Sequence, residues 1–246
     1  MACQICNSQI VSSKLLIQDY EYNSSQFAEY KTCKVCTVQY RNKLRKIDLE
    51  NLYTKDYVPV AGGLIYDFLK KIYANYEWKN IKKLNKELEK PTATEKKLLD
   101  IACGKGFLIE KISENIQFKC FGIDINQDNI NKKKNLSFYK KSFSDFNFIK
   151  KLKPDFIILN NFIEHIEDLE KFDGLLEIMN NKSYLVIITP DNSGNAKKVF
   201  GKYWSGYHSP RHANIFNKKS IQFFLEKKKL HYNITNIYDP LATISS

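Results

Sequence analysis

The stretch of sequence that decides the fold reads Leu98-Leu99-Asp100-Ile101-Ala102-Cys103-Gly104-Lys105-Gly106. Its first half is apolar and predicts a buried strand, and its second half is a glycine turn that leads into a helix. Gly104 and Gly106 let the backbone approach a ligand, because a Cβ atom at either position would obstruct it. Asp100 lies where the strand ends. The stretch therefore predicts a strand, a ligand-binding turn and a helix in succession.

Short apolar runs and amphipathic segments alternate from Lys97 onward. This alternation predicts an α/β fold with a mostly parallel, Rossmann-like sheet and helices on both faces. Strands are expected at 98–102, 118–123, 138–139, 156–159, 184–188 and 231–238. Helices are expected at 107–115, 127–134, 144–151, 167–180 and 219–228, and apolar residues spaced by three and four predict another between 64 and 73.

Asp124 follows the apolar run Cys120-Phe121-Gly122-Ile123, twenty residues after Gly104. A carboxylate at the end of the second strand is placed to accept hydrogen bonds from two ribose hydroxyls. A dinucleotide site shares this geometry, but its third glycine would fall at position 109, which is Ile109. The pattern favours a single-nucleoside ligand over a dinucleotide, and a purely structural glycine turn remains the alternative.

These motifs resemble those of class I S-adenosylmethionine-dependent methyltransferases, and the resemblance covers about residues 97–238. It implies that Asp100 and the turn hold the methionine moiety and that Asp124 binds the ribose. Ser142 stands where the family usually has an acidic residue toward the adenine, which leaves Phe143 to pack on the ring. The resemblance implies cofactor contacts from Asp100, Ala102, Cys103, Gly104, Gly106, Asp124, Ile125, Ser142, Phe143 and Asn160.

A fourth motif, residues 156–166, resembles the strand and following "LEH" turn of the same family. It implies that Glu164 and His165 lie at the mouth of the site. Methyl transfer to a hydroxyl requires removal of a proton, and histidine suits that task near neutral pH. We expect His165 to be the first candidate base and His208 the second, with a structural role for the Glu-His pair as the alternative.

His208 belongs to residues 203–212, which resemble the aromatic "P-x-H" loop of small-molecule and glycan methyltransferases. The resemblance implies that this loop covers the acceptor. Trp204 and Tyr207 would then form walls, and Arg211 would bind an anionic group. The alternative is that the aromatic residues only pack the loop.

Two cysteine pairs, Cys3-x-x-Cys6 and Cys33-x-x-Cys36, have the spacing of a tetrahedral structural Zn²⁺ site. Two such pairs in a short segment favour metal binding over redox chemistry, and reduced free thiols are the alternative. The segment also resembles the zinc-binding segment that precedes the methyltransferase domain in bacterial proteins that modify sugars, surface glycans or natural products.

The length of 246 residues accommodates one α/β domain and a small module. We expect a zinc-binding module at 1–50, a helical linker at 51–94 and a methyltransferase domain at 95–246. The N-terminus lacks the basic start and apolar run of a secretory signal, and no apolar stretch reaches the roughly 20 residues of a membrane span. These features predict a cytoplasmic protein.

The net charge of +12 raises the question of nucleic acid. The lysines, however, mix with acidic residues along helical segments, which favours a solvated face over an RNA track. The sequence therefore predicts methyl transfer from S-adenosylmethionine to a small polar acceptor, such as a hydroxyl of a nucleotide-linked sugar or a surface-glycan precursor in carbohydrate biosynthesis. The alternatives are an RNA methyltransferase and a catalytically silent cofactor-binding module.

Overall fold

The computed structural model describes residues 2–12, 14–22, 26–42, 52, 63–88, 95–127 and 134–238. The chain forms two compact units. The cysteine unit contains Met1–Leu52, Ile163–Leu169 and Thr189–Ser246, and the sheet unit contains Tyr53–Phe162 and Glu170–Ile188. The segments of the two units alternate along the chain. The division into a zinc-binding module, a linker and a methyltransferase domain, with boundaries at residues 50 and 94, remains a prediction.

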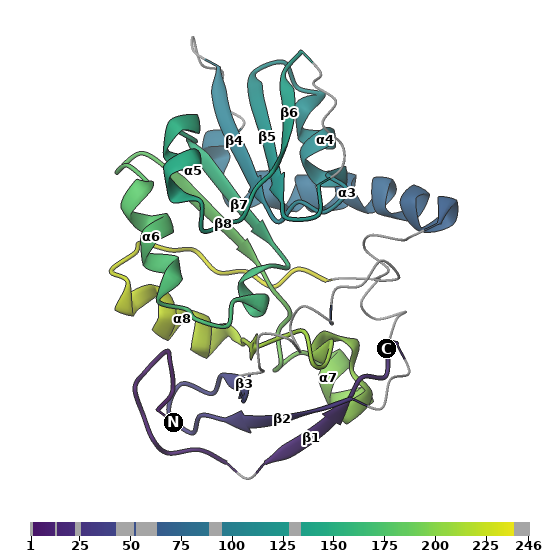
Figure 1. Ribbon diagram of the computed structural model, residues 1–246, viewed down its shortest axis with the longest axis vertical. Coiled ribbons are helices and arrows are strands. Elements are labelled where there is room, and N and C mark those ends of the chain that lie inside the picture. Colours follow the sequence, from purple (N-terminus) through teal and green to yellow (C-terminus); the bar gives the residue numbers. More distant parts are fainter. Residues whose placement is uncertain are drawn as a thin grey trace. The chain divides into compact units, whose positions relative to one another are not determined.

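The sheet unit is built on five parallel strands in the order β6-β5-β4-β7-β8 (Figure 1). The strands are β4 (Lys96–Ile101), β5 (Phe118–Asp124), β6 (Leu136–Lys140), β7 (Phe156–Asn160) and β8 (Tyr184–Ile188). The helices are α3 (Leu64–Leu84), the short η1 (Lys86–Leu88), α4 (Phe107–Ser113), α5 (Phe146–Leu152) and α6 (Lys171–Ile178). This is the Rossmann-like, mostly parallel α/β sheet that the alternating pattern predicts.

Helices cover both faces of this sheet because its strands are apolar on both sides. Helices α3 and α4 pack together, and Trp78, Ile81 and Leu108 join Leu98 and Phe118 in one core cluster. The first two turns of α3 contribute little to it. Leu64 is 91% exposed and Phe68 is 63% exposed, so these two residues, which the sequence pattern assigns to the apolar side of the helix, do not join the core.

Five of the expected strands form, with shifts of one or two residues at their ends. The sixth, at 231–238, is wrong, because these residues have no regular structure and pair with no strand among the described residues. The expected helix at 167–180 begins later, at Lys171, and the residues from 167 to 170 form a bend and a turn instead. The expected helix at 127–134 falls mostly on 128–133, outside the described residues.

The cysteine unit holds an antiparallel sheet in the order β1-β2-β3-β9. Its elements are β1 (Leu15–Gln18), β2 (Phe27–Thr32), β3 (Gln39–Arg41), η2 (Ile163–His165), α7 (Asn195–Phe200), η3 (Gly201–Tyr203), η4 (Ser205–Tyr207), β9 (Asn214–Ile215) and α8 (Lys218–Lys227). Helix α8, expected from the sequence, begins with a capping box in which Asn217 and Ser220 bond each other's backbone N–H groups. Strand β9 joins a late segment of the chain to the N-terminal sheet.

None of the described helices combines the length and the apolar composition that crossing a membrane requires.

Candidate functional site

The cofactor residues expected from the sequence meet at the carboxyl edge of the parallel sheet. Ile101 pairs with Ile123 on one side and with Leu159 on the other, so β4, β5 and β7 end at the same level. Strand order changes direction at β4, and such a switch point leaves a crevice at the carboxyl ends of the strands. Asp100, Asp124 and Asn160 are carried to this edge by three different strands.

The turn after β4 has the backbone that its glycines predict. Gly104 and Gly106 adopt positive φ angles of 54° and 83°. A Cβ atom on Gly106 would lie 2.4 Å from a ring carbon of Phe138, so only glycine fits beneath that ring. A Cβ atom on Gly104 would meet nothing within 4 Å. The turn therefore presents bare backbone toward open space at this position.

Asp100 is 3% exposed, and its Oδ1 atom has no hydrogen-bond partner among the residues that the structure describes. Burial raises the pKa of its carboxyl group well above the usual range, and the nearby charges of Glu77 and Asp124 raise it further. Glu77 comes from α3 and was not found by sequence reasoning, because nothing in its local pattern marks it. An accumulation of buried negative charge suits a positively charged ligand.

Asp124 and Gln127 both hold Gly104. The Asp124 Oδ2 atom accepts a hydrogen bond from the Gly104 N–H at 3.0 Å, and Gln127 Nε2 donates to the Gly104 carbonyl at 3.0 Å. The second carboxylate oxygen of Asp124 accepts from the Asn126 N–H at 2.8 Å. Gln127 is 4% exposed, and sequence reasoning missed it although it follows Asp124 by only three residues. These bonds fix the turn from both sides.

The remaining expected cofactor residues lie after β5, β6 and β7. Asn160 Nδ2 donates to Glu77 Oε1 at 2.8 Å, which ties the end of β7 to α3. Phe143 contacts Phe162, with ring centroids 5.1 Å apart, and Ile125 is 58% exposed. The Ser142 hydroxyl bonds the Ser144 N–H and hydroxyl, which shapes its own loop. A role for each of these residues in binding a cofactor remains a prediction.

The residues present fit S-adenosylmethionine. Its sulfonium and ammonium groups are positive, and the edge of the sheet offers the buried, unsatisfied carboxylate oxygen of Asp100. Its amino-acid end requires close backbone approach, and Gly104 provides it. A pyrophosphate would instead meet the negative charges of Asp100, Glu77 and Asp124, which disfavours a dinucleotide.

Three histidines form a cluster within the cysteine unit. The ring centroids of His165 and His212 are 4.6 Å apart, and those of His208 and His212 are 5.0 Å apart. Burial lowers the pKa of His165 to about 3 and that of His212 well below its usual range. Glu164 is fully buried beside them, burial raises its pKa to about 8, and its Oε2 atom accepts from the Thr189 hydroxyl at 3.0 Å.

His208 contacts a carboxylate that the sequence did not indicate. Its Nδ1 atom forms an ion pair with Glu21 Oε2. Burial alone would raise the pKa of Glu21, but the hydrogen bond from His208 and the charges of His208 and Arg211 leave it lowered. A carboxylate on one ring nitrogen orients an imidazole and fixes its tautomer.

The sequence-based roles of Arg211, Trp204 and Tyr207 need correction. Arg211 is 6% exposed, and its guanidinium pairs with Asp19 at 3.1 Å, so its charge is already engaged inside the unit. Trp204 and Tyr207 are buried in a core cluster with Tyr30. The aromatic residues of this loop therefore pack the core of the unit, which is the alternative that the sequence left open.

Four cysteines converge in two matching turns. The Sγ atoms of Cys3 and Cys36 are 3.5 Å apart, and those of Cys6 and Cys33 are 3.4 Å apart. The Asn7 N–H donates to the Cys3 carbonyl in one turn, and the Thr37 N–H donates to the Cys33 carbonyl in the other. Each turn is therefore closed by a hydrogen bond to its first cysteine. All four Sγ atoms lie within 4.8 Å of one another. Four thiols at these separations could surround one tetrahedral ion.

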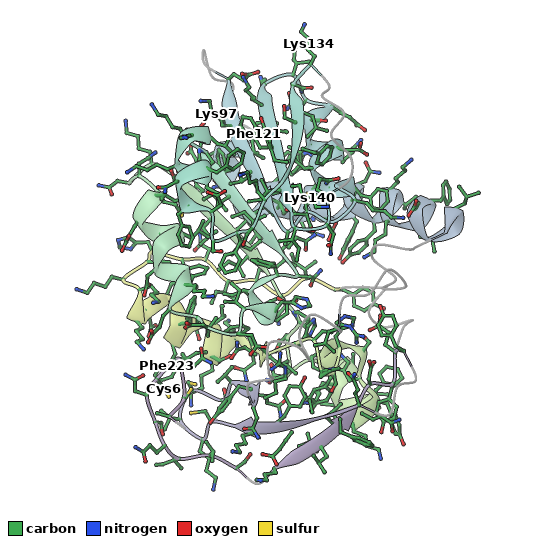
Figure 2. All side chains as sticks on the ribbon, viewed as in Figure 1. Cys6, Lys97, Phe121, Lys134, Lys140 and Phe223 are labelled. Atoms are coloured by element: carbon green, nitrogen blue, oxygen red, sulfur yellow. The ribbon has the colours of Figure 1, made fainter. Side chains whose placement is uncertain are left out.

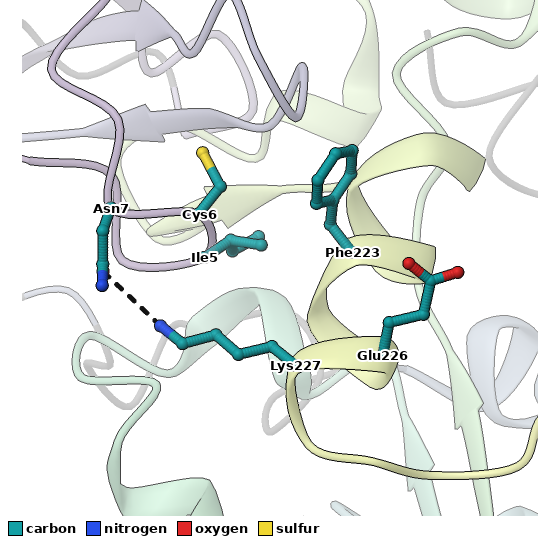
Figure 3. Close-up of a pocket in the computed structure, with 6 residues that line it drawn as sticks. All are labelled: Ile5, Cys6, Asn7, Phe223, Glu226 and Lys227. Atoms are coloured by element: carbon teal, nitrogen blue, oxygen red, sulfur yellow. Dashed lines mark hydrogen bonds between the residues drawn. The ribbon is translucent and has the colours of Figure 1, made fainter.

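A shallow cavity of about 300 Å³ lies beside this cluster (Figure 3). It is lined by Ile5, Cys6, Asn7, Phe223, Glu226 and Lys227. Lys227 Nζ donates to Asn7 Oδ1 at 3.5 Å, as the dashed line in Figure 3 marks, and Cys6 and Phe223, which Figure 2 also labels, both line the cavity. The cavity contains none of the residues expected to bind the cofactor, so it is not the cofactor site.

A family model described as a methyltransferase domain matches residues 72–228, well over half of the chain. A comparison with curated proteins found no match. Among solved structures, a SAM-dependent methyltransferase from Archaeoglobus fulgidus is similar, with 20% identity and a TM-score of 0.47, covering 71% of this chain and 83% of that one.

The plantazolicin methyltransferase BpumL, solved in complex with SAH, is similar at 21% identity and a TM-score of 0.45, covering 75% of this chain and 70% of its own. The family assignment rests on the matched model. The chain belongs to the methyltransferase-domain family and is an S-adenosylmethionine-dependent methyltransferase.

Proposed function

We propose that the enzyme transfers the methyl group to a hydroxyl of a small polar acceptor, such as a nucleotide-linked sugar or a surface-glycan precursor. The observation that carries the proposal is the pairing of His208 with Glu21, because a carboxylate-oriented imidazole is suited to removing a hydroxyl proton. Nitrogen nucleophiles that are neutral at pH 7 need no such base. The identification of a sugar rests on the resemblance of the cysteine segment and the "P-x-H" loop to those of glycan-modifying enzymes.

At the sheet edge, bound S-adenosylmethionine supplies an electrophilic methyl group on a sulfonium. Asp100 and the turn at Gly104 hold its amino-acid end, and Asp124 binds its ribose through a carboxylate already fixed by two backbone N–H groups. Phe143 would pack against the adenine, and Asn160, which is hydrogen-bonded to Glu77, would line the pocket near the transferable methyl group. The protein contributes mainly alignment, since an in-line displacement requires the acceptor oxygen on the axis of the breaking bond.

We assign the proton-accepting role to His208 rather than to His165. Glu21 bonds the Nδ1 atom of His208, so the tautomer that leaves Nε2 as the proton acceptor is favoured. His165, with a pKa of about 3, is too weak a base at neutral pH to be efficient. Glu21 acts through His208 and is therefore a positioning residue.

We also propose that the four cysteines bind one structural Zn²⁺. Ideal zinc–thiolate bonds of about 2.3 Å place tetrahedral sulfur atoms about 3.8 Å apart. The separations of 3.4 and 3.5 Å need only a small expansion to reach that value. The two matching turns, each closed by an N–H bond to the first cysteine, orient the thiolates before the ion arrives.

The test of the acceptor proposal measures formation of S-adenosylhomocysteine with a panel of nucleotide-linked sugars. His208→Gln should lower kcat at least a hundredfold with one of them, while the Kd for S-adenosylmethionine stays unchanged. Glu21→Gln should lower kcat less than His208→Gln does, because it weakens the contact that orients the His208 ring and leaves the imidazole in place. His231→Gln, in an exposed histidine outside the cluster, is the matched control.

If the His208→Gln variant turns over like the wild type, His208 is not the proton acceptor. Absence of turnover with every sugar nucleotide would remove the acceptor class. The net charge of +12 favours RNA as the second candidate. That candidate predicts copurifying RNA and methylation that falls steeply between 50 and 200 mM salt, roughly the range over which phosphate contacts are screened.

A further inference from the structure

Glu164, His165 and His212 form a second group of side chains with the composition of a metal site. Each offers one ligand atom, and these atoms all lie within 4.8 Å of one another. All three residues belong to the cysteine unit, with two from η2 and one from the loop before β9. The group is separate from the four cysteines, and its ligand atoms are oxygen and nitrogen instead of sulfur.

The hydrogen bonds of His212 determine which ring nitrogen is available. Its Nδ1 atom lies 2.9 Å from the Gly206 carbonyl oxygen. A carbonyl only accepts hydrogen bonds, so Nδ1 carries the proton and Nε2 carries a lone pair. Metal-binding histidines typically donate their second N–H to a carbonyl or carboxylate in this way. The His165 ring likewise hydrogen-bonds to the backbone of Arg211.

The lone pair of His212 Nε2 faces a carboxylate oxygen that has no partner. Glu164 is 0% exposed, and its Oε1 atom makes no hydrogen bond to any part of the chain that the structure describes. Its Oε2 atom is already bonded by Thr189. The separation of Glu164 Oε1 from His212 Nε2 is 3.9 Å, which is too long for a hydrogen bond.

Burying a carboxylate oxygen without a hydrogen-bond donor is unfavourable, and a bound cation between the two atoms would remove that cost. Zinc bonds to nitrogen and oxygen ligands are about 2.0–2.1 Å long, which places the ligand atoms of a tetrahedral ion about 3.4 Å apart, so the observed 3.9 Å needs only a small contraction. We propose that Glu164, His165 and His212 bind one divalent transition-metal ion. Two imidazoles disfavour Mg²⁺ and Ca²⁺, which prefer oxygen ligands.

Three protein ligands leave at least one coordination position for water or another oxygen ligand, in contrast to a closed four-cysteine site. This inference does not rest on the acceptor proposal, because it concerns binding of the ion alone. It also explains why the sequence pairs a carboxylate with a histidine at positions 164 and 165 without requiring His165 to carry a proton.

The experiment uses the full chain with its cysteines loaded with Zn²⁺, and titrates Co²⁺ in the absence of S-adenosylmethionine. Calorimetry and visible absorption should show one saturable Co²⁺ per chain, with weak ligand-field bands and no thiolate-to-cobalt charge transfer. Glu164→Gln keeps the acceptor for Thr189 but removes the charge. His212→Asn keeps a donor toward Gly206 but removes the Nε2 ligand. Each should weaken Co²⁺ binding at least tenfold.

His231→Asn is the matched control and should bind Co²⁺ like the wild type. Retained zinc and a cooperative thermal transition establish that a variant is folded, and the two variants test the site independently. The proposal would be overturned by a folded wild type without saturable Co²⁺ uptake. It would equally be overturned by uptake that neither substitution weakens, or by a cobalt spectrum showing only thiolate charge transfer.

Discussion

Asp100→Asn should stabilise the cofactor-free protein while weakening its binding of S-adenosylmethionine. Asp100 is 3% exposed, its Oδ1 atom lacks a partner among the described residues, and Glu77 and Asp124 add like charge nearby. An isosteric amide removes the charge, so the cost of an unsatisfied buried charged group, about 1–3 kcal/mol, should be recovered in the free energy of unfolding at pH 7.

The sign of the pH dependence follows from the raised pKa of Asp100. Below its ordinary value of 3.8 the carboxyl is neutral in both the folded and unfolded states, and the variant and wild type should be equally stable. As the pH rises above 3.8, the unfolded state ionises first and the wild type loses stability relative to Asp100→Asn. The cofactor affinity should fall at least tenfold, about 1.4 kcal/mol, because the positive ligand loses its partner.

Urea unfolding between pH 4 and pH 8 and calorimetric titration with S-adenosylmethionine measure the two effects. Asp155→Asn is the matched control, because that carboxylate already accepts a hydrogen bond from the Lys97 N–H at 2.8 Å. It should bring no gain in stability. An Asp100→Asn protein that is less stable than the wild type at pH 7, or that binds the cofactor equally well, would refute the reasoning.

Three further changes test other parts of the structure. Gly106→Ala should lower the free energy of unfolding by about 2–4 kcal/mol, since it combines a positive φ with a contact of 2.4 Å to the Phe138 ring; a loss below 1 kcal/mol in urea unfolding would contradict this. Cys33→Ser should abolish the proposed bound Zn²⁺ by elemental analysis, whereas Cys120→Ser, in the sheet unit, should retain it; zinc retained by Cys33→Ser would count against the four-cysteine site. Burial lowers the pKa of Lys197 from 10.5 to about 8. Between these two pH values only the unfolded state still binds the proton, so the free energy of unfolding of the wild type should rise by up to about 1 kcal/mol across this range. Lys197→Met should show no such gain, and identical pH profiles for the two proteins would remove this explanation.

The features of the sheet edge that sequence reasoning predicted are local ones. An apolar run followed by Gly104 and Gly106 specifies a strand and a positive-φ turn within nine residues, and no distant contact is needed to recognise it. The same holds for the two Cys-x-x-Cys turns. The strand expected at 231–238 did not form because, among the residues that the structure describes, no neighbouring strand pairs with it, and a strand cannot satisfy its backbone alone.

The partners of the site residues could not be predicted in this way. Glu77 reaches Asn160 across 83 positions, and Glu21 reaches His208 across an even longer stretch of chain. Single helical or loop carboxylates carry no signal in their neighbours, so only the packing of the elements reveals which charge they meet. For Arg211 the sequence instead predicted a contact that the structure does not support. Its position in the loop suggested binding of an anionic ligand, but its guanidinium forms an ion pair with Asp19.

By itself, the sequence determined the parallel α/β sheet, the glycine turn and the two cysteine turns, because each depends on spacing over a few residues. Only the tertiary structure decided that Asp100 Oδ1 is buried with no donor among the described residues, and that His165 is too desolvated to hold a proton near neutral pH. It also decided that Glu164 and His212 face each other. Burial and electrostatic environment are properties of the surrounding packing, and residues far apart in the chain create them.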